Sequence, residues 1–502
     1  MRTPPLAIAL GLVVVTGCPK EKPKDKEPAE AVTEFRPTEK KPIDPKPLPP
    51  LAEDPGGATG KPLQATGFGG LGIDAPKAIA VAGGEAYVAG HFDGEIDFGG
   101  TIGKRTAPSE DPKRPRSNAY LAKLGKDGQV DWVHTWGAQR DDLARAVAIR
   151  GDQVVVAGHF LDEMTLGDIT KKSFGSDDVF VAAFSKAGEV RWVWNFGGID
   201  SDGANAIAAT PDGGWIVGGS FSRTASFGAA SFTSRGGTDA MLLKLAPGGE
   251  IEWAKQFGGR YNDTILYVAV DGQGNIIVQG VFMDVADWGG KEPLTGAGGK
   301  DNDVVLAKYD LNGDHLWSQR FGNAFDDVAG GVTVDPAGNI TMTGSFDQSV
   351  SFGEGDDHRS AGESDIFVAR FTPDGALAWA RTYGADRPDI GQGIASDAAG
   401  NTVTTGWFEG TVDFGSGPLT SRGNKDVFAI KLDRTGALVW AQRFGDKDHD
   451  QARAVAIDET GASYVAGIYR FKLDAVAPAL DSTRAAGDRV PKPDTFVLKL
   501  DR

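Results

Sequence analysis

The segment Ala78-Ile79-Ala80-Val81 recurs with small changes along the chain, and this repetition decides the fold. Its six counterparts follow at intervals of 60 to 68 residues and begin at Ala146, Ala206, Tyr267, Gly331, Gly393 and Ala454. Three more strand-like segments with period-two alternation follow each one, bounded by turn residues such as Asp335-Pro336-Ala337-Gly338-Asn339. Four antiparallel strands repeated in this way must bury both faces of their sheet against copies of themselves, which predicts a closed ring of sheets.

The repeat therefore predicts an all-β fold, a seven-bladed β-propeller with four antiparallel strands per blade over residues 56–502. The seventh unit stops at its third strand, Phe496–Leu500. The segment Gln64–Gly70 near the front matches the fourth-strand segment Trp253–Gly259. We expect this N-terminal strand to complete the last blade, because an unclosed ring would expose sheet edges.

Short motifs in the unit carry a resemblance to a known family. They are Gly-x-Phe, Asp-x-Phe-Val-Ala-Lys-Leu and Trp-Ala-x-x-Phe-Gly-Gly, as in Gly344-Ser345-Phe346 and Trp253-Ala254-Lys255-Gln256-Phe257-Gly258-Gly259. With these motifs the chain resembles, from about residue 62 to 502, the seven-bladed β-propeller repeat family often called SBBP. The resemblance implies the propeller fold and export from a bacterial cell, and it implies no catalytic residues.

The first residues predict export and lipidation. The apolar run Leu6–Val15 is too short to cross a bilayer and has the length of a signal-peptide core. It ends in Val15-Thr16-Gly17-Cys18, which resembles the lipobox of bacterial lipoproteins, and Cys18 is the only cysteine. We expect a signal peptide over 1–17 and a lipidated Cys18 that anchors the chain in a membrane. An ordinary secretory signal is the alternative.

Residues 18–55 are rich in Pro, Lys and Glu and predict a solvated, disordered linker. Pro19 rather than Asp follows Cys18, which favours the outer membrane or cell surface over the inner membrane. The whole chain has 52 Lys and Arg against 69 Asp and Glu, a formal charge of −17. This charge argues against nucleic acid as a partner. We expect a monomer whose ligand is an unidentified protein or glycan.

An aspartate lies five residues before the second residue of each repeated segment. Because it falls in the connection between units, we expect seven carboxylates around one mouth of the central channel. They either bind a cation, with calcium as the candidate cofactor, or accept backbone N–H bonds and fix the loop; the strict repetition favours the structural role. The set is Asp74, Asp142, Asp202, Asp263, Asp327, Asp389 and Asp450.

The loops of the first and seventh units are longer than the others and carry basic residues. Because ring closure makes these units neighbours, the loops form a candidate binding surface for an anionic partner, with a solvated insertion as the alternative. The residues are Lys104, Arg105, Lys113, Arg114, Arg116, Arg484, Arg489 and Lys492. His91 and His159 occupy equivalent positions in adjacent units, and two histidines without a third ligand do not predict a metal site.

No Ser/His/Asp order, phosphate-binding loop or carboxylate pair stands out from the repeat, so the sequence predicts a binding or scaffolding module at the bacterial cell envelope. Two alternatives stay open. One is an extracellular polymer-degrading hydrolase or lyase with its site at the channel mouth, and the other is an envelope-assembly factor. Polar side chains that break the repeat near the channel would distinguish an active site from a scaffold.

Overall fold

The computed structural model describes residues 48–107, 116–137, 141–483 and 490–502. The predicted signal peptide, the lipidated cysteine and most of the predicted linker lie outside these residues. The described residues belong to one compact unit. None of its elements is a helix long and apolar enough to cross a membrane.

Each repeat begins with two strands joined by a tight hairpin. The first strands are β2 (Asp74–Ala82), β8 (Leu143–Arg150), β14 (Gly203–Ala209), β18 (Thr264–Val270), β24 (Val328–Val334), β28 (Ile390–Ser396) and β32 (Gln451–Ile457). The second strands are β3 (Glu85–Asp93), β9 (Gln153–Phe160), β15 (Trp215–Phe227), β19 (Ile276–Met283), β25 (Ile340–Ser351), β29 (Thr402–Asp413) and β33 (Ser463–Tyr469).

Two further antiparallel strands complete each set. The third strands are β6 (Ser117–Leu124), β12 (Asp178–Ser185), β16 (Ala230–Leu245), β22 (Asn302–Tyr309), β26 (Asp357–Phe371), β30 (Pro418–Leu432) and β36 (Asp494–Leu500). The fourth strands are β7 (Val130–Trp136), β13 (Val190–Gly198), β17 (Ile251–Gly259), β23 (His315–Phe321), β27 (Leu377–Tyr383), β31 (Leu438–Phe444) and β1 (Pro62–Gly70). Short strands extend the connections between second and third strands: β4 (Glu95–Asp97), β5 (Lys104–Thr106), β10 (Glu163–Leu166), β11 (Ile169–Lys172), β20 (Val285–Asp287), β21 (Leu294–Thr295), β34 (Lys472–Leu473) and β35 (Leu480–Asp481).

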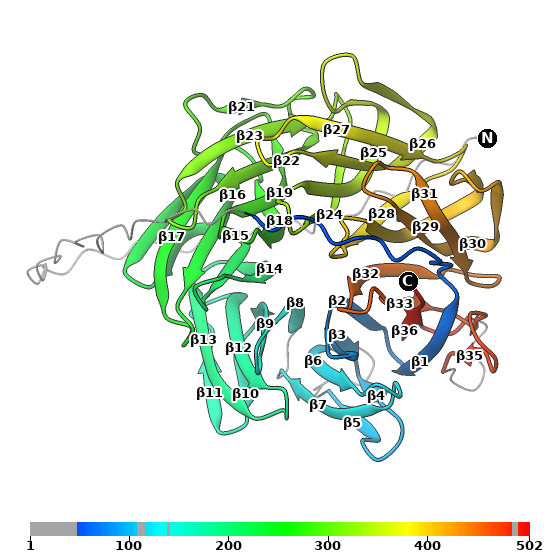
Figure 1. Cartoon of the computed structure of the whole chain (residues 1–502). Helices are drawn as coiled ribbons and strands as arrows, with labels where there is room; N and C mark the ends of the chain where they lie inside the picture. The colour runs from blue at the N-terminus through cyan, green and yellow to red at the C-terminus, as the bar shows by residue number, and fades with distance from the viewer. Residues whose placement is uncertain (1–47, 108–115, 138–140, 484–489) are drawn as a thin grey trace, which may run out of the picture. The chain divides into compact units, whose positions relative to one another are not determined.

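The first strands form a closed ring. Each contacts the first strand of the next unit, in the order β2, β8, β14, β18, β24, β28, β32 and back to β2. Figure 1 shows these strands around the middle of the molecule and the fourth strands toward its periphery. The predicted all-β propeller of antiparallel sheets is confirmed.

The predicted count of seven blades is not borne out by the sheets, because hydrogen bonds join some units. Four sheets have four strands, one has six (β32-β33-β36-β1-β4-β5) and one has ten, running from β8 to β21. The junctions are glycine pairs at the ends of fourth strands. Gly69 and Gly70 pair with β4, Gly197 and Gly198 with β15, and Gly258 and Gly259 with β20. The sheet count therefore departs from the seven repeat units, since the fourth strand of one unit continues into the next.

The predicted pairing of the N-terminal strand is confirmed. β1 lies antiparallel to β36, with Pro62 opposite Leu500 and Phe68 opposite Thr495. The Asp501 amide donates to the Lys61 carbonyl at 2.9 Å and extends the pairing by one step. The ring thus closes between the two ends of the described chain.

The core lies between neighbouring units rather than within any one of them. Ile79 and Val88 of the first unit share a cluster with Ala466 and Val497 of the last. Equivalent clusters bring together each other neighbouring pair, for example Val179 with Val217 and Ile366 with Ile430. Burying apolar area at about 25 cal/mol per Å² makes these junctions the main stabilising contacts of the ring.

Candidate functional site: the central channel

Each first strand carries a β-bulge at the same position. The register against the second strand shifts between Pro76 and Ala78 in β2, and between Ala452 and Ala454 in β32. The other first strands shift at the matching place. A bulge inserts one residue that has no partner in the ladder and re-aims its side chain. The inserted residues are Lys77, Arg145, Asn205, Leu266, Gly330, Gln392 and Arg453.

Most of these side chains line a cavity of about 160 Å³ inside the ring. Its polar wall consists of Lys77, Arg145, Arg453, Asn205 and Gln392, together with Tyr267 beside the bulge of β18. The three cations come from β32, β2 and β8, which are consecutive in the ring. On the other side Gly330 places no side chain in the space. The cavity is therefore cationic on one arc.

The three cations are not paired with acids in the part of the chain that the structure describes. Among the residues that the structure describes, no carboxylate lies within 4.0 Å of Lys77, Arg145 or Arg453. Burial, followed by the charges of Arg453 and Arg145, lowers the pKa of Lys77 to about 7. Burial also lowers the pKa of both arginines. The site is electrostatically unsatisfied within this part of the chain.

Neutral groups surround the cations. The Arg145 Nε–H donates to His159 Nδ1 at 3.2 Å, so the remaining proton of that neutral imidazole is on Nε2. Burial lowers the pKa of His159 to about 3, with the charge of Arg145 as the next cause. Arg453 Nε and Gln392 Oε1 are buried and have no hydrogen-bond partner among the described residues. The channel thus holds one donor, the Arg453 Nε–H, and one acceptor, Gln392 Oε1, that the described residues leave without a partner.

A second cavity, of about 540 Å³, lies at the other ends of the first strands. Val270, Val334, Ser396 and Ile457, the last residues of four first strands, contribute to its wall. Residues 52–55, the hairpins that follow those strands, and the side chains of Lys431 and Arg502 form the rest of the wall. Figure 1 shows this dark-blue segment crossing the ring on its way to β1.

Specific contacts hold the crossing segment. The Ala52 amide donates to the Ala398 carbonyl at 2.9 Å, and Asn401 Nδ2 donates to Asp54 Oδ2 at 3.0 Å. Residues 48–55 end the segment that the sequence predicts as disordered linker. In the structure they lie against the propeller, because their backbone and carboxylate groups find partners on its hairpins.

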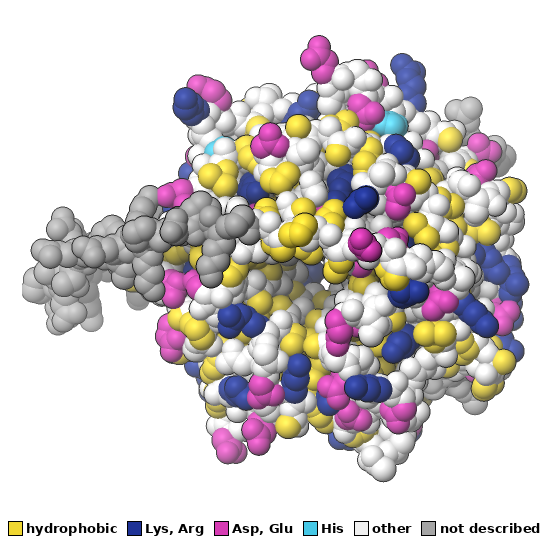
Figure 2. Space-filling model, in the orientation of Figure 1, with side chains coloured by type: hydrophobic (Ala, Val, Ile, Leu, Met, Phe, Trp, Pro, Cys, Tyr) yellow, Lys and Arg dark blue, Asp and Glu magenta, His cyan; other side chains and the backbone are white. Residues whose placement is uncertain are grey.

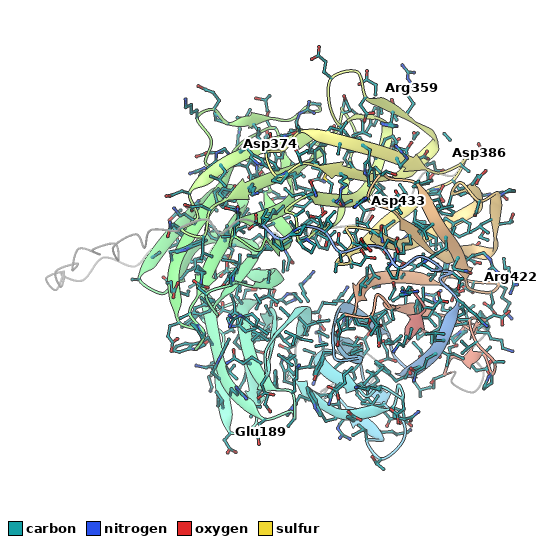
Figure 3. The ribbon with its side chains drawn as sticks, viewed as in Figure 1. Glu189, Arg359, Asp374, Asp386, Arg422 and Asp433 are labelled. Atoms are coloured by element: carbon teal, nitrogen blue, oxygen red, sulfur yellow. The ribbon has the colours of Figure 1, made fainter. Side chains whose placement is uncertain are left out.

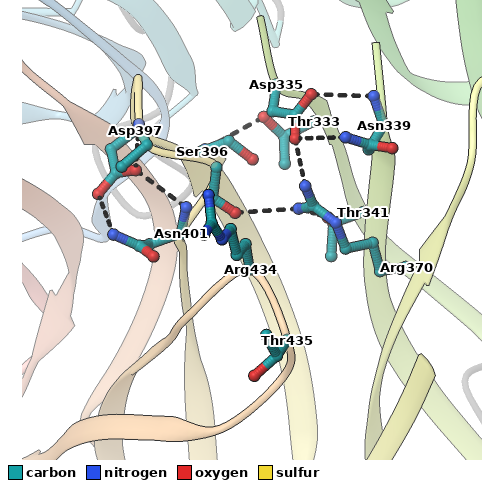
Figure 4. A network of polar contacts seen from close by, with 12 residues as sticks. Thr333, Asp335, Asn339, Thr341, Arg370, Ser396, Asp397, Asn401, Arg434 and Thr435 are labelled. Atoms are coloured by element: carbon teal, nitrogen blue, oxygen red, sulfur yellow. Dashed lines mark hydrogen bonds and ion pairs between the residues drawn. The ribbon is translucent and has the colours of Figure 1, made fainter. Parts of the chain in front are cut away.

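Those hairpins share a buried polar network, drawn in Figure 4. Asp335 accepts the Asn339 amide at 2.9 Å and forms an ion pair with Arg370, and both side chains are buried. Arg370 Nη1 also donates to the Gly400 carbonyl of the next unit at 3.0 Å. Asp397 makes the matching pair with Lys431 at 3.0 Å. This network fixes the hairpins, and its members Asp335, Asp397 and Lys431 also contribute to the wall of the second cavity.

The seven predicted channel-mouth aspartates do not line either cavity. They are buried between units. Asp202 accepts the Gly198 amide at 2.7 Å and the Ser222 amide at 3.0 Å, and Asp389 and Asp450 have the same two kinds of donor. The acidic ring at the channel mouth stays a prediction, and in Asp202, Asp389 and Asp450 these bonds hold the carboxylate in the junction of two units. The contacts favour the structural role.

Burial raises the pKa of these aspartates, to about 9 for Asp74, about 8 for Asp327 and about 8 for Asp450. For Asp74 the neighbouring Asp494 carboxylate is the second cause. Over the described residues, no group of three or more His, Cys, Asp or Glu side chains is placed to hold a metal ion. Calcium binding stays a prediction.

The predicted basic surface is only partly within the described residues: Lys113, Arg114, Arg484 and Arg489 lie outside them. Lys104 Nζ is 2.6 Å from Glu95 Oε1, and Arg105 donates to the Ile102 carbonyl at 2.8 Å. Arg116 Nη1 is 3.6 Å from Asp141 Oδ2. Burial raises the pKa of the Asp93 carboxyl, and the charge of Lys492 acts in the opposite direction. Figure 2 shows acidic and basic side chains interspersed over the face of Figure 1, and Figure 3 shows Glu189, Arg359 and Arg422 at its rim.

Sequence reasoning missed the cationic channel. The sequence feature that could have revealed it is the residue just before each repeated segment. In chain order this residue is Lys, Arg, Asn, Leu, Gly, Gln and Arg. This variation contrasts with the uniform segment that follows. The bulge that aims these residues inward leaves no mark in the pattern.

No family model matches the chain. The chain is 21% identical over 402 residues to an uncharacterized WD repeat-containing protein of Acanthamoeba polyphaga mimivirus, covering 72% of this chain and 26% of that protein. It is 24% identical over 415 residues to the regulatory protein FlaEY of Caulobacter vibrioides, covering 77% and 42%. The chain thus spans less than half the length of either relative.

Solved structures with a similar fold include Sqt1 from Chaetomium thermophilum, with a TM-score of 0.39, 10% identity and coverage of 87% of this chain and 100% of that chain. They also include a PL25 ulvan lyase, with a TM-score of 0.41, 11% identity and coverage of 80% and 93%. The resemblance to the SBBP family stays a prediction.

Proposed function

We propose that this chain is a binding or scaffolding module: an exported lipoprotein that presents a seven-bladed propeller of the SBBP type at the outer membrane or cell surface. The observation that carries the binding role is the cavity inside the ring, whose polar wall breaks the symmetry of the repeat. The fold needs no cation there, because Gly330 and Gln392 occupy the same position in other units.

We infer the proposed count of seven blades from the seven repeat units and not from the number of hydrogen-bonded sheets. The closed ring of first strands and the apolar clusters between neighbouring units support seven blades. On this interpretation the ten-stranded sheet contains two blades and the six-stranded sheet one, each extended across a junction. The similarity to a WD repeat-containing protein supports a propeller used for binding.

Membrane attachment is tested at Cys18. The full chain, expressed in a diderm bacterium, is expected in the detergent phase of a Triton X-114 separation and to incorporate labelled palmitate. Cys18→Ala should move it to the aqueous phase and abolish labelling. A matched Thr16→Ala variant should keep both properties. Retention of Cys18→Ala in the detergent phase would overturn the lipoprotein assignment.

The ligand is sought with a glycan array and an envelope pull-down on the same purified protein, with size-exclusion light scattering to test that it is a monomer. Saturable binding without turnover supports the binding module. Cleavage of an array glycan would instead establish the polymer-degrading alternative. Capture of assembly-machine subunits dependent on the propeller surface would establish the envelope-assembly alternative.

A further inference from the structure

We propose that the central channel binds a small oxyanion, a phosphate, sulfate or carboxylate group, between Arg453, Lys77 and Arg145. The inference rests on the proposed binding function and names the chemical class of ligand for that cavity. Three consecutive first strands supply the three cations, and each side chain is turned inward by its bulge.

The charge balance of the cavity supports this assignment. Three like charges line a space of about 160 Å³, and none has a carboxylate within 4.0 Å among the described residues. The charge of Asp177, which lies beyond that distance, raises the pKa of Arg145 and so opposes the effect of burial. Bringing cations together away from water is unfavourable unless an anion compensates them. A bound oxyanion supplies the missing charge.

The donor geometry matches the same class of ligand. Arginine presents a planar fork of N–H groups that pairs with two oxygens of one anion, and lysine adds a point charge. Arg453 Nε is buried and has no acceptor among the described residues. Gln392, from the strand β28 beside β32, and Tyr267 add polar groups to the wall of the cavity. The volume equals that of about five water molecules, which suits an inorganic oxyanion or the terminal group of a larger molecule.

The repeat supplies an internal comparison. A side chain required by the fold would recur at this position, as the buried aspartates between units do. Here the seven units carry Lys, Arg, Asn, Leu, Gly, Gln and Arg. The cations are confined to three adjacent units, so they are a local addition to a scaffold that folds without them.

The test uses the full chain in detergent, titrated with inorganic phosphate at constant ionic strength and followed by calorimetry and by the unfolding midpoint. A saturable signal and a rising midpoint are expected with phosphate but not with chloride. The same two measurements are repeated with sulfate and with acetate. Binding of sulfate but not acetate identifies an inorganic oxyanion site, and binding of acetate identifies a carboxylate site.

Arg453→Gln and Lys77→Gln should each weaken phosphate about tenfold or more, since each removes a charge-assisted contact. Their midpoints without phosphate should stay equal to or above that of the parent, because a repulsive charge is gone. Arg453→Lys, which keeps the charge, should lose less affinity. The control Lys425→Gln removes a half-buried lysine that lies over the Trp407 ring.

The proposal is overturned if phosphate, sulfate and acetate give no saturable signal, or if Lys425→Gln weakens binding as much as Arg453→Gln does. Neither result depends on lipidation at Cys18 or on a macromolecular partner. Failure of this site is therefore distinguishable from failure of the envelope-module assignment.

Discussion

Lys77, Arg145 and Arg453 owe their direction to one inserted residue in each first strand. Alternation along an unbroken strand would send neighbouring side chains to opposite faces of the sheet. The bulge interrupts this alternation in β32, β2 and β8, where these three neighbouring strands line the central cavity. Single residues at a shared backbone irregularity thus set the electrostatics of the channel.

Lys77 should make oxyanion binding depend on pH. Its pKa is about 7, against an ordinary 10.5, whereas His91 and His159 have pKa values of about 3 and stay neutral. Tyr267 has a pKa of about 12, and burial lowers the pKa of both arginines from its ordinary value. Sulfate, whose charge is constant over this range, should bind more weakly at pH 9 than at pH 6 by calorimetry. Equal affinities at both pH values would contradict the role of Lys77.

The aspartates between units should make stability fall as pH rises. The folded pKa of Asp450 is about 8, raised first by burial and then by the Asp446 and Asp426 carboxylates, against 3.8 ordinarily. Between these values the folded chain binds more protons than the unfolded chain, so the free energy of unfolding decreases with pH. Urea unfolding from pH 5 to 8.5 should show this decline, and Asp450→Asn should make it shallower.

Calcium provides the complementary measurement at the same residues. Asp450 already accepts the Asp446 and Arg470 amides at 2.9 and 3.1 Å. Millimolar calcium at pH 8 should therefore leave the unfolding midpoint unchanged. A clear increase in the midpoint would show that these carboxylates bind the cation instead.

At the scale of the element, glycine decides how closely neighbouring units join. Gly445 has φ +138°, and a Cβ there would lie 2.8 Å from Asp450 Oδ2 and 2.9 Å from Asp426 Cγ. A larger residue would push apart the two carboxylates that hold the junction. The aromatic-Gly motif at the end of the fourth strands is therefore a packing requirement as well as a family resemblance.

The hairpin network of Figure 4 should be a major stabilising element. Asp335→Ala leaves the buried Arg370 guanidinium without its ion-pair partner, which costs about 3–5 kcal/mol. Guanidinium unfolding followed by tryptophan fluorescence measures the loss. Asp374→Ala removes an exposed hairpin aspartate and should leave the midpoint nearly unchanged (Figure 3). Similar losses in the two variants would show that the ion pair contributes little.

The sequence predicted elements better than their side-chain environments. Gln64–Gly70 was placed correctly against Phe496–Leu500, because repeated motifs reveal a missing strand. The joined sheets were not predicted, since pairing of Gly197 and Gly198 across a junction depends on the curvature of the strands. The channel cations were missed, and the burial of the seven aspartates was not predicted, for one reason. Both orientations depend on local backbone geometry that residue spacing does not encode.

At the scale of the whole molecule, the ring depends on its closing strand. Phe68 of β1 packs on Phe98 and Tyr120 of the first unit, with ring centroids 5.2 and 5.9 Å apart. Its strand partner β36 belongs to the last unit. One side chain therefore contributes both to the last sheet and to the core it shares with the first unit.

Phe68→Ala should destabilise the ring by about 3–5 kcal/mol, the usual cost of truncating a buried phenylalanine. Chemical unfolding gives the magnitude, and hydrogen exchange should show the loss of protection spreading from β1 to β36. Leu63→Ala in the same strand changes a side chain that is 56% exposed and serves as the control. Faster exchange limited to β1 would contradict closure by this strand.

The order of synthesis gives the pairing of Pro62 with Leu500 a further consequence. β1 leaves the ribosome first among the strands of the propeller, and its partner leaves last. The nascent chain must keep that strand unpaired until β36 has been translated, and a product terminated before β36 has nothing to pair with it. Pairing of the first strand thus reports that the last strand of the propeller has been made, and chains that end before β36 present an open edge to proteases.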